Sequence, residues 1–317
     1  MLAFGPVPSR RLGHSLGVNN IPPKFCTYSC AYCQLGKTEN TQIKRGTFYE
    51  PDKILEAAQK KLAGARKKGE AVDYLTIVPD GEPTLDTNLG KVVGLLKQEG
   101  IPIAVISNAS LLWDAKVRCD LSTADWVSLK IDAIKDEIWT KINRPDYSLK
   151  HEDILGGIKT FANEFKGELT TETMLVKGAN DNSTELGQIA NFIAGLKPSK
   201  AYISIPTRPP AEKWATPPLE STVNLAYQIF TEKGIPVEYL IGYEGNEFAF
   251  SGDVKADLLA ITAVHPMRKD AVREFLSKAG ADWSTIDKLI DGGQLIEVSY
   301  RGKKFYIRKF ARQGAGA

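Results

Sequence analysis

The sequence predicts an α/β protein in which parallel strands alternate with helices, followed by a smaller module of different pattern. Short runs rich in β-branched and aromatic residues, bounded by Gly, Pro, Asp or Asn, recur over residues 11–241. Stretches with apolar residues three and four positions apart separate these runs. Strands that alternate with helices pair in parallel, because each crossover helix returns the chain to the same end of the sheet. From about Asp253 the alternation stops.

Six strands and the helices between them account for most of the first 241 residues. The strands are expected at 11–19, 74–78, 102–107, 126–131, 168–176 and 202–205, with a last short strand near 237–241. The helices are expected at 51–63, 87–98, 153–165, Ser183–Leu196 and 221–233. Asn182, with Glu185 three residues later, is typical of a helix start. The first strand leads into a cysteine-rich loop, and loops that follow parallel strands commonly carry the chemistry.

The C-terminal part predicts a second domain at 251–317, which leaves 1–250 as the core domain. The boundary is expected near 250, around Glu244-Gly245-Asn246. Two helices at 268–278 and Ser284–Asp291 precede a hairpin of Leu295–Tyr300 and 304–309. Two helices followed by a hairpin form a winged-helix-like layout.

Composition sets broad limits on the class of protein. The chain has 317 residues, 43% apolar content and a net charge of +3, which is too small to indicate a partner by itself. No apolar run approaches the ~18 residues of a membrane helix, and no signal peptide is evident, so we expect a cytoplasmic protein without a membrane partner. The four cysteines do not suggest a disulfide framework. Nothing in the sequence indicates an oligomeric state.

Three cysteines, Cys26, Cys30 and Cys33, have the spacing C-x3-C-x2-C on one Pro-rich loop. Three thiolates on a short loop can hold three corners of a 4Fe–4S cluster and leave one iron open to a small molecule. A structural zinc site is the first alternative, but zinc wants four ligands, typically in two pairs. The residues that could supply a fourth ligand are His14, Cys119, His151 and His265, none of them at a paired spacing. Three buried cysteines without a ligand are the second alternative.

With Tyr32 directly before the last cysteine, the motif resembles the signature of the radical S-adenosylmethionine (radical SAM) superfamily. The resemblance covers roughly residues 4–241, and residues 4–33 are similar to Fe–S oxidoreductases related to the wyosine-forming tRNA enzymes. It implies a partial (β/α)6 radical SAM barrel, one 4Fe–4S cluster on the three cysteines, and S-adenosylmethionine as cofactor beside Tyr32. It also implies a one-electron reductant of the flavodoxin or ferredoxin type. Cys119 is expected to be a buried, inert thiol. It is the one cysteine left beside the motif, so no second cluster can be built from this chain alone, which disfavours a wyosine-type reaction.

The second strand ends in Asp80-Gly81-Glu82-Pro83. The superfamily has a Gly-Gly-Glu-like turn at this place, which holds the methionine amino group. An ammonium group prefers a carboxylate and strand-end carbonyls as acceptors, and Gly81 would allow a close backbone approach. An ordinary strand-to-helix turn is the alternative, because Asp-Gly is a common turn dipeptide.

Polar side chains at later strand ends are expected to complete the cofactor pocket. Alternation puts Leu129 and Ile131 on the opposite face of the fourth strand from its polar residues. The residues expected to contact the cofactor are Asn108, Ser128, Lys130 and Asp132. A structural ion pair between Lys130 and Asp132 is the alternative. Glu172 and Met174 share a face and could also reach the pocket, whereas the histidines offer no pairing for base catalysis, so the catalytic residues stay unknown.

The resemblance implies reductive cleavage of S-adenosylmethionine to a 5′-deoxyadenosyl radical, which abstracts hydrogen from an unidentified RNA, peptide or metabolite.

Residues 298–317 carry six basic residues and no acid, interleaved with aromatic residues. The basic residues are Arg301, Lys303, Lys304, Arg308, Lys309 and Arg312, and the aromatic ones are Tyr300, Phe305, Tyr306 and Phe310. Such a pattern suits a phosphate backbone with exposed bases. Peptide contact, or a docking domain with an aromatic core, is the alternative. An Fe–S sensor that binds nucleic acid through the winged module is the alternative function.

Overall fold

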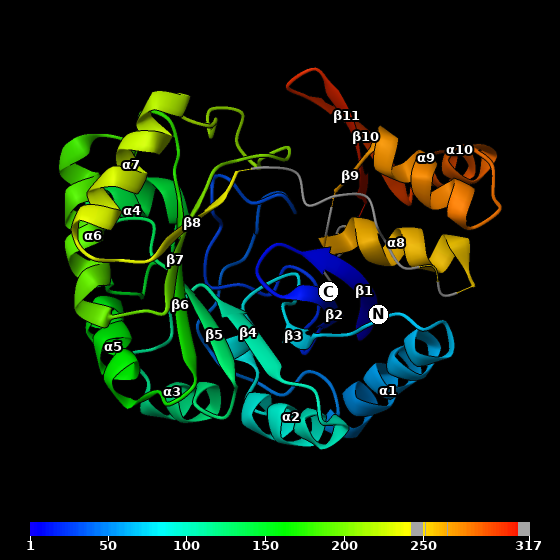
Figure 1. Cartoon of the computed structure of the whole chain (residues 1–317), viewed down its shortest axis with the longest axis horizontal. Coiled ribbons are helices and arrows are strands. Elements are labelled where there is room, and N and C mark those ends of the chain that lie inside the picture. The colour runs from blue at the N-terminus through cyan, green and yellow to red at the C-terminus, as the bar shows by residue number, and fades with distance from the viewer. Residues whose placement is uncertain (242–249, 251, 265, 310–317) are drawn as a thin grey trace, which may run out of the picture.

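The strands of the core form one curled sheet whose spatial order follows the chain order (Figure 1). The computed structural model describes residues 1–241, 250, 252–264 and 266–309, so the expected boundary at 244–246, His265, Phe310 and Arg312 lie outside the described residues. Within them the sheet has eight strands, and all pairs after the first are parallel. The strands are β1 (Ala3–Ser9), β2 (Gly13–Val18), β3 (Tyr74–Ile77), β4 (Ile103–Ser107), β5 (Trp126–Lys130), β6 (Glu168–Met174), β7 (Lys200–Ser204) and β8 (Val237–Leu240). The predicted α/β partial barrel is confirmed.

One strand of this sheet was not expected from the sequence. β1 runs antiparallel to β2 at the edge of the sheet and contains Pro6 and Pro8. Proline cannot donate to a ladder, so it argues against a strand except at an edge, which is where β1 lies. Phe4 of β1 covers Gly17 of β2, where a side-chain β-carbon would lie only 2.0 Å from the Phe4 ring. The sheet therefore begins one strand earlier than predicted.

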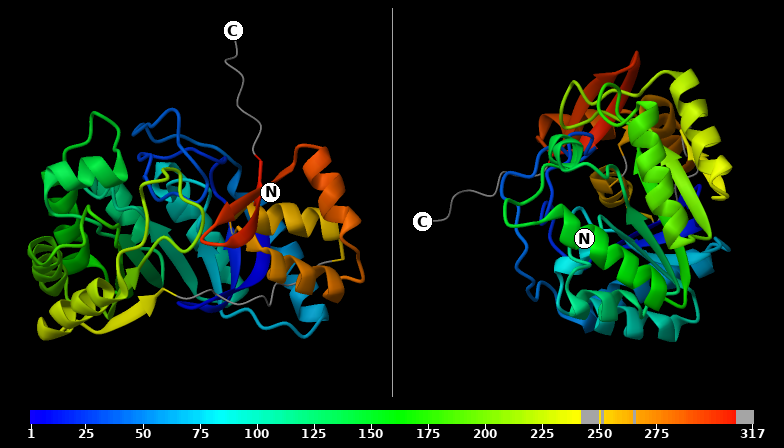
Figure 2. Two further views of the ribbon diagram at one scale, coloured as in Figure 1. Left: turned by 90° about the horizontal axis from the view of Figure 1, so that it is seen from above. Right: turned by 90° about the vertical axis from the view of Figure 1, so that its left-hand side faces the viewer.

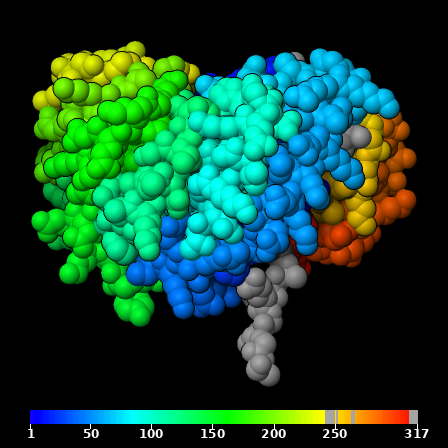
Figure 3. Space-filling view, turned by 90° about the horizontal axis from the view of Figure 1, so that it is seen from below, coloured from blue at the N-terminus to red at the C-terminus, as the bar shows by residue number. Residues whose placement is uncertain are grey.

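Seven helices accompany the strands in the described part of the core, and all but one of them cover the convex face of the sheet. They are α1 (Pro51–Lys67), α2 (Leu89–Leu96), α3 (Ala115–Leu121), α4 (Asp136–Asn143), α5 (His151–Glu164), α6 (Ser183–Leu196) and α7 (Glu220–Glu232), with short 3-10 turns at Pro83–Leu85 and Lys97–Glu99. All but α4 form an arc outside the strands, and α2 lies in cyan beside the blue α1 on this outer surface (Figure 1, Figure 3). Leu129 and Ile131 belong to the large apolar core beneath these helices. Alternate residues, such as Trp126 and Tyr202, form a smaller apolar cluster on the concave face.

The C-terminal module packs against the first strand of the sheet (Figure 1, Figure 2). Its elements are α8 (Val254–Val264), β9 (Met267–Arg268), α9 (Lys269–Lys278), α10 (Ser284–Asp291), β10 (Leu295–Tyr300) and β11 (Lys303–Arg308). Strands β10, β11 and β9 form a small antiparallel sheet, and the module has an apolar core of its own, on which Val7 of β1 packs. Phe305 and Tyr306 are buried, which agrees for these two rings with the alternative of a docking domain with an aromatic core. No helix in the described part of the chain is both long and apolar enough to span a membrane.

Candidate functional site

The cysteine loop lies inside the arc of strands, against segments that follow the strands (Figure 1). Its backbone is bonded to two later parts of the chain. The amides of Ser29 and Ala31 donate to the carbonyls of Arg144 and Ile142, at 3.0 and 2.8 Å. The carbonyl of Ala31 accepts from the amide of Glu212 at 2.9 Å. These bonds fix the loop between the end of α4 and the segment after β7.

The turn at 80–83 forms a third anchor of the loop. Lys24 donates its amide to the Asp80 carbonyl at 2.7 Å, and Glu82 donates its amide to the Phe25 carbonyl at 2.9 Å. A β-carbon on Gly81 would lie 1.9 Å from that same carbonyl oxygen, so only glycine fits. The close approach at Gly81 in this structure is therefore to the cysteine loop, whereas the sequence suggested an approach to the methionine ammonium.

The Glu82 carboxylate is occupied within the protein. It accepts hydrogen bonds from the amide and hydroxyl of Thr84, from Ser107 Oγ at 2.7 Å and from the amide of Asn108 at 2.7 Å. Three of these bonds end on Oε1 and one ends on Oε2, and together they tie the end of β3 to the end of β4. Asp80 is different, because its buried Oδ1 has no hydrogen-bond partner in the described structure and burial raises the pKa of Asp80 to about 7.

All three motif cysteines are free thiols and partly buried. The side-chain amides of Asn108 and Asn143 donate to the sulfurs of Cys26 and Cys30, at 3.6 and 3.7 Å. Burial, reinforced by the neighbouring Cys33, raises the pKa of Cys30 to about 12, and burial also raises the pKa of Cys26. Without a cation these thiols stay protonated, whereas a bound metal deprotonates its thiol ligands outright. The donor set, soft sulfurs with amide hydrogen bonds, fits an iron–sulfur cluster.

The structure also bears on the fourth cysteine, Cys119, and on the alternative of a site for a single metal ion. Cys119 is exposed on α3, so the expectation of a buried thiol is wrong. The buried face of α3 is made by Val117 and Leu121, four residues apart, and Cys119 lies between them on the outer side. Among the residues that the structure describes, no group of three or more His, Cys, Asp or Glu side chains is placed to hold a single metal ion.

Lys130 and Glu172 form a buried charged network on the concave face. Lys130 Nζ lies 2.9 Å from Glu172 Oε1, and Arg11 and Ser204 also donate to the Glu172 carboxylate. Burial alone would raise the pKa of Glu172, but Lys130 and then Arg11 hold it well below its usual range. The ion pair considered from the sequence therefore exists, with Glu172 of the next strand as the partner of Lys130.

Asp132 lies directly after β5 and connects this network to the cysteine loop. Its carboxylate accepts from the hydroxyl of Tyr32, from Asn143 Nδ2 at 2.8 Å and from the amide of Met174 at 2.8 Å. Lys130 Nζ lies 5.0 Å from the centre of the Tyr32 ring, a cation–π contact. The structure thus brings together Tyr32, Lys130 and Asp132. Ser128 lies two residues before Lys130 in β5. Its hydroxyl is buried and has no hydrogen-bond partner in the described structure.

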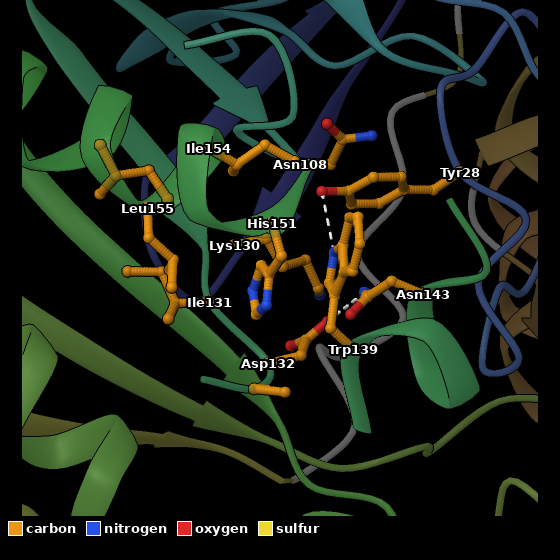
Figure 4. A pocket seen from close by; sticks show the side chains of 12 residues that line it. Tyr28, Asn108, Lys130, Ile131, Asp132, Trp139, Asn143, His151, Ile154 and Leu155 are labelled. Carbon is orange, nitrogen blue, oxygen red and sulfur yellow. Dashed lines mark hydrogen bonds between the residues drawn. The ribbon is translucent and has the colours of Figure 1, made fainter. Parts of the chain in front are cut away.

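A small cavity lies behind Asp132, between β5, α4 and α5 (Figure 4). Its volume of about 20 Å³ suits roughly one water molecule. Trp139 stacks on His151 with ring centres 4.5 Å apart and donates its Nε1 to the hydroxyl of Tyr28 at 3.1 Å. Asn143, which contacts both Cys30 and Asp132, is the last residue of α4. From the sequence it was considered only as part of Asn143-Arg144-Pro145, a loop that could face the substrate, and not as a residue beside the cysteines.

Comparison with known proteins gives consistent matches. Residues 20–190 match the family model described as the Radical SAM superfamily. A UPF0026 protein of Methanocaldococcus jannaschii is 44% identical over 97% of this chain and 96% of its own length. A probable dual-specificity RNA methyltransferase RlmN of Endomicrobium trichonymphae is 24% identical over 67% of this chain and 61% of its own. A solved structure of TYW1 with a lysine-pyruvate adduct bound is similar in fold, with a TM-score of 0.55 and 18% identity over 69% of this chain and 74% of that one.

Proposed function

Because the chain belongs to the radical SAM superfamily and is an enzyme, we propose that it cleaves S-adenosylmethionine reductively and abstracts hydrogen from a substrate. Members of this superfamily generally use a 4Fe–4S cluster and S-adenosylmethionine. Such a cluster would supply the single electron that converts S-adenosylmethionine into methionine and a 5′-deoxyadenosyl radical. The protein's task is then to bind, to orient and to exclude water.

The observation that carries this proposal is the cysteine loop. Cys26, Cys30 and Cys33 are free thiols on a loop anchored at its backbone to three other segments. Asn108 and Asn143 donate to two of the sulfurs, and such hydrogen bonds stabilise the thiolate form. We assign these three cysteines as the ligands of one cluster.

The turn and the polar strand ends would bind S-adenosylmethionine. In the turn Asp80-Gly81-Glu82-Pro83, the candidate acceptors for the methionine ammonium are the first three backbone carbonyls. The carbonyl of Pro83 already accepts from Asn20 Nδ2 at 3.0 Å and from the amide of Asp86 at 3.2 Å. The carboxylate of Glu82 would act by positioning the Asn108 backbone. Lys130 and Asp132, held by Glu172 and Tyr32, would present one charge of each sign to the methionine and ribose groups. The unpartnered hydroxyl of Ser128 is the candidate for a further polar contact.

The test is anaerobic reconstitution of the full chain with iron and sulfide, followed by dithionite and S-adenosylmethionine. Formation of 5′-deoxyadenosine is expected. Cys30→Ala should remove both the cluster absorbance and the product. Cys119→Ala is the matched control, because this cysteine is exposed on α3 and should leave both unchanged. A fully loaded cluster that yields no 5′-deoxyadenosine would refute the proposal.

We propose that the C-terminal module contacts the substrate or a partner protein. We take 1–250 as the catalytic domain and 251–317 as a winged-helix-like domain, a proposal supported by the order helix, strand, helix, helix and hairpin in its described residues. The hydroxyl of Tyr300, in the hairpin, donates to the Pro206 carbonyl after β7 at 2.9 Å, which brings basic residues of the hairpin to the barrel. RNA is the favoured substrate class because a relative carries the name of an RNA methyltransferase. A flavodoxin- or ferredoxin-type protein is the proposed reductant, and the sensor interpretation is set aside because the chain is an enzyme.

A further inference from the structure

An open groove beside the cysteine loop gathers basic side chains around an exposed tryptophan. Its volume is about 610 Å³, and it is lined by Thr140, Lys141, Arg144, Lys177 and Trp214. Three of these five residues are cationic, and none is acidic among the described lining. Trp214 is 36% exposed, so part of its ring is accessible from solvent. We call this feature the basic groove.

The backbone holds the groove residues in place. Thr140 and Lys141 lie on the last turn of α4, which Arg144 ends in the left-handed conformation with φ of 49°. Lys177 lies in the segment after β6, and its amide donates to the Thr216 carbonyl at 2.9 Å. This bond joins the segment after β6 to the segment of Trp214. The groove is therefore formed by the end of α4 and by the segments after β6 and β7, and two of these three parts also bond the cysteine loop.

The charges of the groove are only partly compensated. Glu212 lies at the rim and pairs with Arg144 Nη1 at 2.6 Å and with Lys37 Nζ at 2.8 Å, so a single carboxylate serves two cations. Lys141 Nζ donates to the neutral carbonyl of Gly178 at 3.1 Å and lies 5.6 Å from the centre of the Trp214 ring. An excess of positive charge beside an aromatic face remains, and it suits an anion that carries a flat ring.

The segments that form the wall of the groove bond directly to the backbone of the cysteine loop. Arg144 and Ile142 bond through their carbonyls to Ser29 and Ala31 of the cysteine loop, and Glu212 bonds through its amide to Ala31. The same two segments thus form the wall of the groove and the anchor of the loop. A polymer bound in the groove would therefore lie close to the three cysteines. A free metabolite would fit in the active site and would not need a second surface beside it.

We propose that the basic groove binds single-stranded RNA, with backbone phosphates on Lys141, Arg144 and Lys177 and one unstacked base on Trp214. Single-stranded RNA is recognised by stacking its bases on aromatic rings while cations track its phosphates. Tyr147, three residues after Arg144, is 98% exposed and offers a second ring on the continuing segment. This inference rests on the proposed function, in which RNA is the substrate class, and it assigns the surface that would bind it.

The test measures binding without catalysis. Fluorescence anisotropy of a 5′-fluorescein-labelled twelve-nucleotide poly(U) RNA is recorded against the full-length protein at several salt concentrations. Lys177→Glu should weaken binding about tenfold and make the dependence on salt shallower, because a phosphate contact is lost. Trp214→Ala should weaken binding about tenfold without changing the salt dependence, and Trp214→Phe should restore most of it, because the ring rather than the charge is involved.

The matched control is Lys60→Glu on α1, an exposed lysine on the outer helical face. It changes the net charge exactly as Lys177→Glu does and should leave the affinity unchanged. Equal losses in the two charge reversals would overturn the proposal, since binding would then follow net charge alone. Equal binding of a polyglutamate of matched charge, unaffected by Trp214→Ala, would also overturn it in favour of an acidic peptide.

The outcome is separable from that of the proposed function. Formation of 5′-deoxyadenosine without any binding of the RNA would overturn the groove assignment alone. Binding of the RNA that depends on Lys177 and Trp214 would support the assignment even if S-adenosylmethionine were not cleaved.

Discussion

Gly81 shows at the scale of one residue how the site depends on a close approach. A β-carbon there would collide with the Phe25 carbonyl, which cannot move without displacing the cysteine loop. We expect Gly81→Ala to lower the free energy of unfolding by more than about 2 kcal/mol and to reduce the iron bound after reconstitution. Thermal unfolding and an iron-to-protein ratio measure these effects.

Gly94→Ala is the control for this substitution. Gly94 lies in α2 with open space around its α-carbon, so an added methyl should be neutral or stabilise the helix by up to about 1 kcal/mol. If both variants bind iron like the wild type, the anchoring role of the turn at Gly81 is wrong.

Glu172 is the carboxylate on which two buried cations depend. Glu172→Gln would leave Lys130 and Arg11 without their counter-charge, so we expect a loss of about 3 kcal/mol in the free energy of unfolding at pH 7. Since the pKa of Glu172 is held low, its contribution is complete above the unfolded value of about 4.3 and is lost as pH falls toward the folded value. The difference between variant and wild type should therefore shrink between pH 7 and pH 3 in urea titrations.

A half-exposed pair in the same sheet provides the comparison. Glu238 lies 2.6 Å from Lys200, and both side chains are 40% exposed. Glu238→Gln should cost less than about 1 kcal/mol, because solvent screens such pairs. A loss as large as that of Glu172→Gln would mean that burial does not set the strength of the Glu172 network.

At the scale of elements, α4 and α5 meet through the stack of Trp139 on His151 (Figure 4). Burial lowers the pKa of His151 to about 4, so the folded protein keeps it neutral while the unfolded chain takes up a proton below about pH 6.5. The wild type should thus lose about 2 kcal/mol of stability through this group between pH 7 and pH 5. His151→Phe keeps a stacked ring without the proton uptake, and its stability should fall less over the same range. Parallel pH profiles from urea unfolding would contradict this account.

The elements that the sequence predicted are those with a long, regular pattern. The strand expected at 126–131 and the helix at Ser183–Leu196 were found almost as predicted, because alternation and a capping Asn182 mark them locally. Helices were also expected before Cys119 and after the fourth strand, but without bounds, and α3 and α4 span only seven and eight residues. β9 was not expected, because its two residues form a strand only by pairing with β11.

The site was predictable in its residue types and much less in its partners. The cysteine spacing and the polar face of β5 are visible in the sequence, and the side chains do lie together. The partner of Lys130 was not predictable, because the register between β5 and β6 places Glu172 opposite it from 42 residues away. In the same way, nothing local shows that the Glu82 carboxylate is used by Ser107 and Thr84.

At the scale of the whole molecule, the C-terminal module is joined to the core by polar as well as apolar contacts. Lys61 of α1 lies 3.2 Å from Asp257 of α8, and both side chains are largely buried. A double-mutant cycle of Lys61→Ala and Asp257→Ala should give a coupling free energy above about 0.5 kcal/mol, because the pair is shielded from water. Additive losses in chemical denaturation would mean that this contact does not hold the module to the core.

The anchors of the cysteine loop also set an order of events during synthesis. The distant segments that anchor residues 24–31, from the turn at Gly81 to Arg144 and Glu212, are translated after the cysteines. Domains fold as units once enough chain has emerged. The thiols therefore stay on an unanchored loop until about two thirds of the chain has been made. Under the proposed function, the cluster would be held in its final surroundings only after Glu212 has emerged and the barrel has closed around the loop.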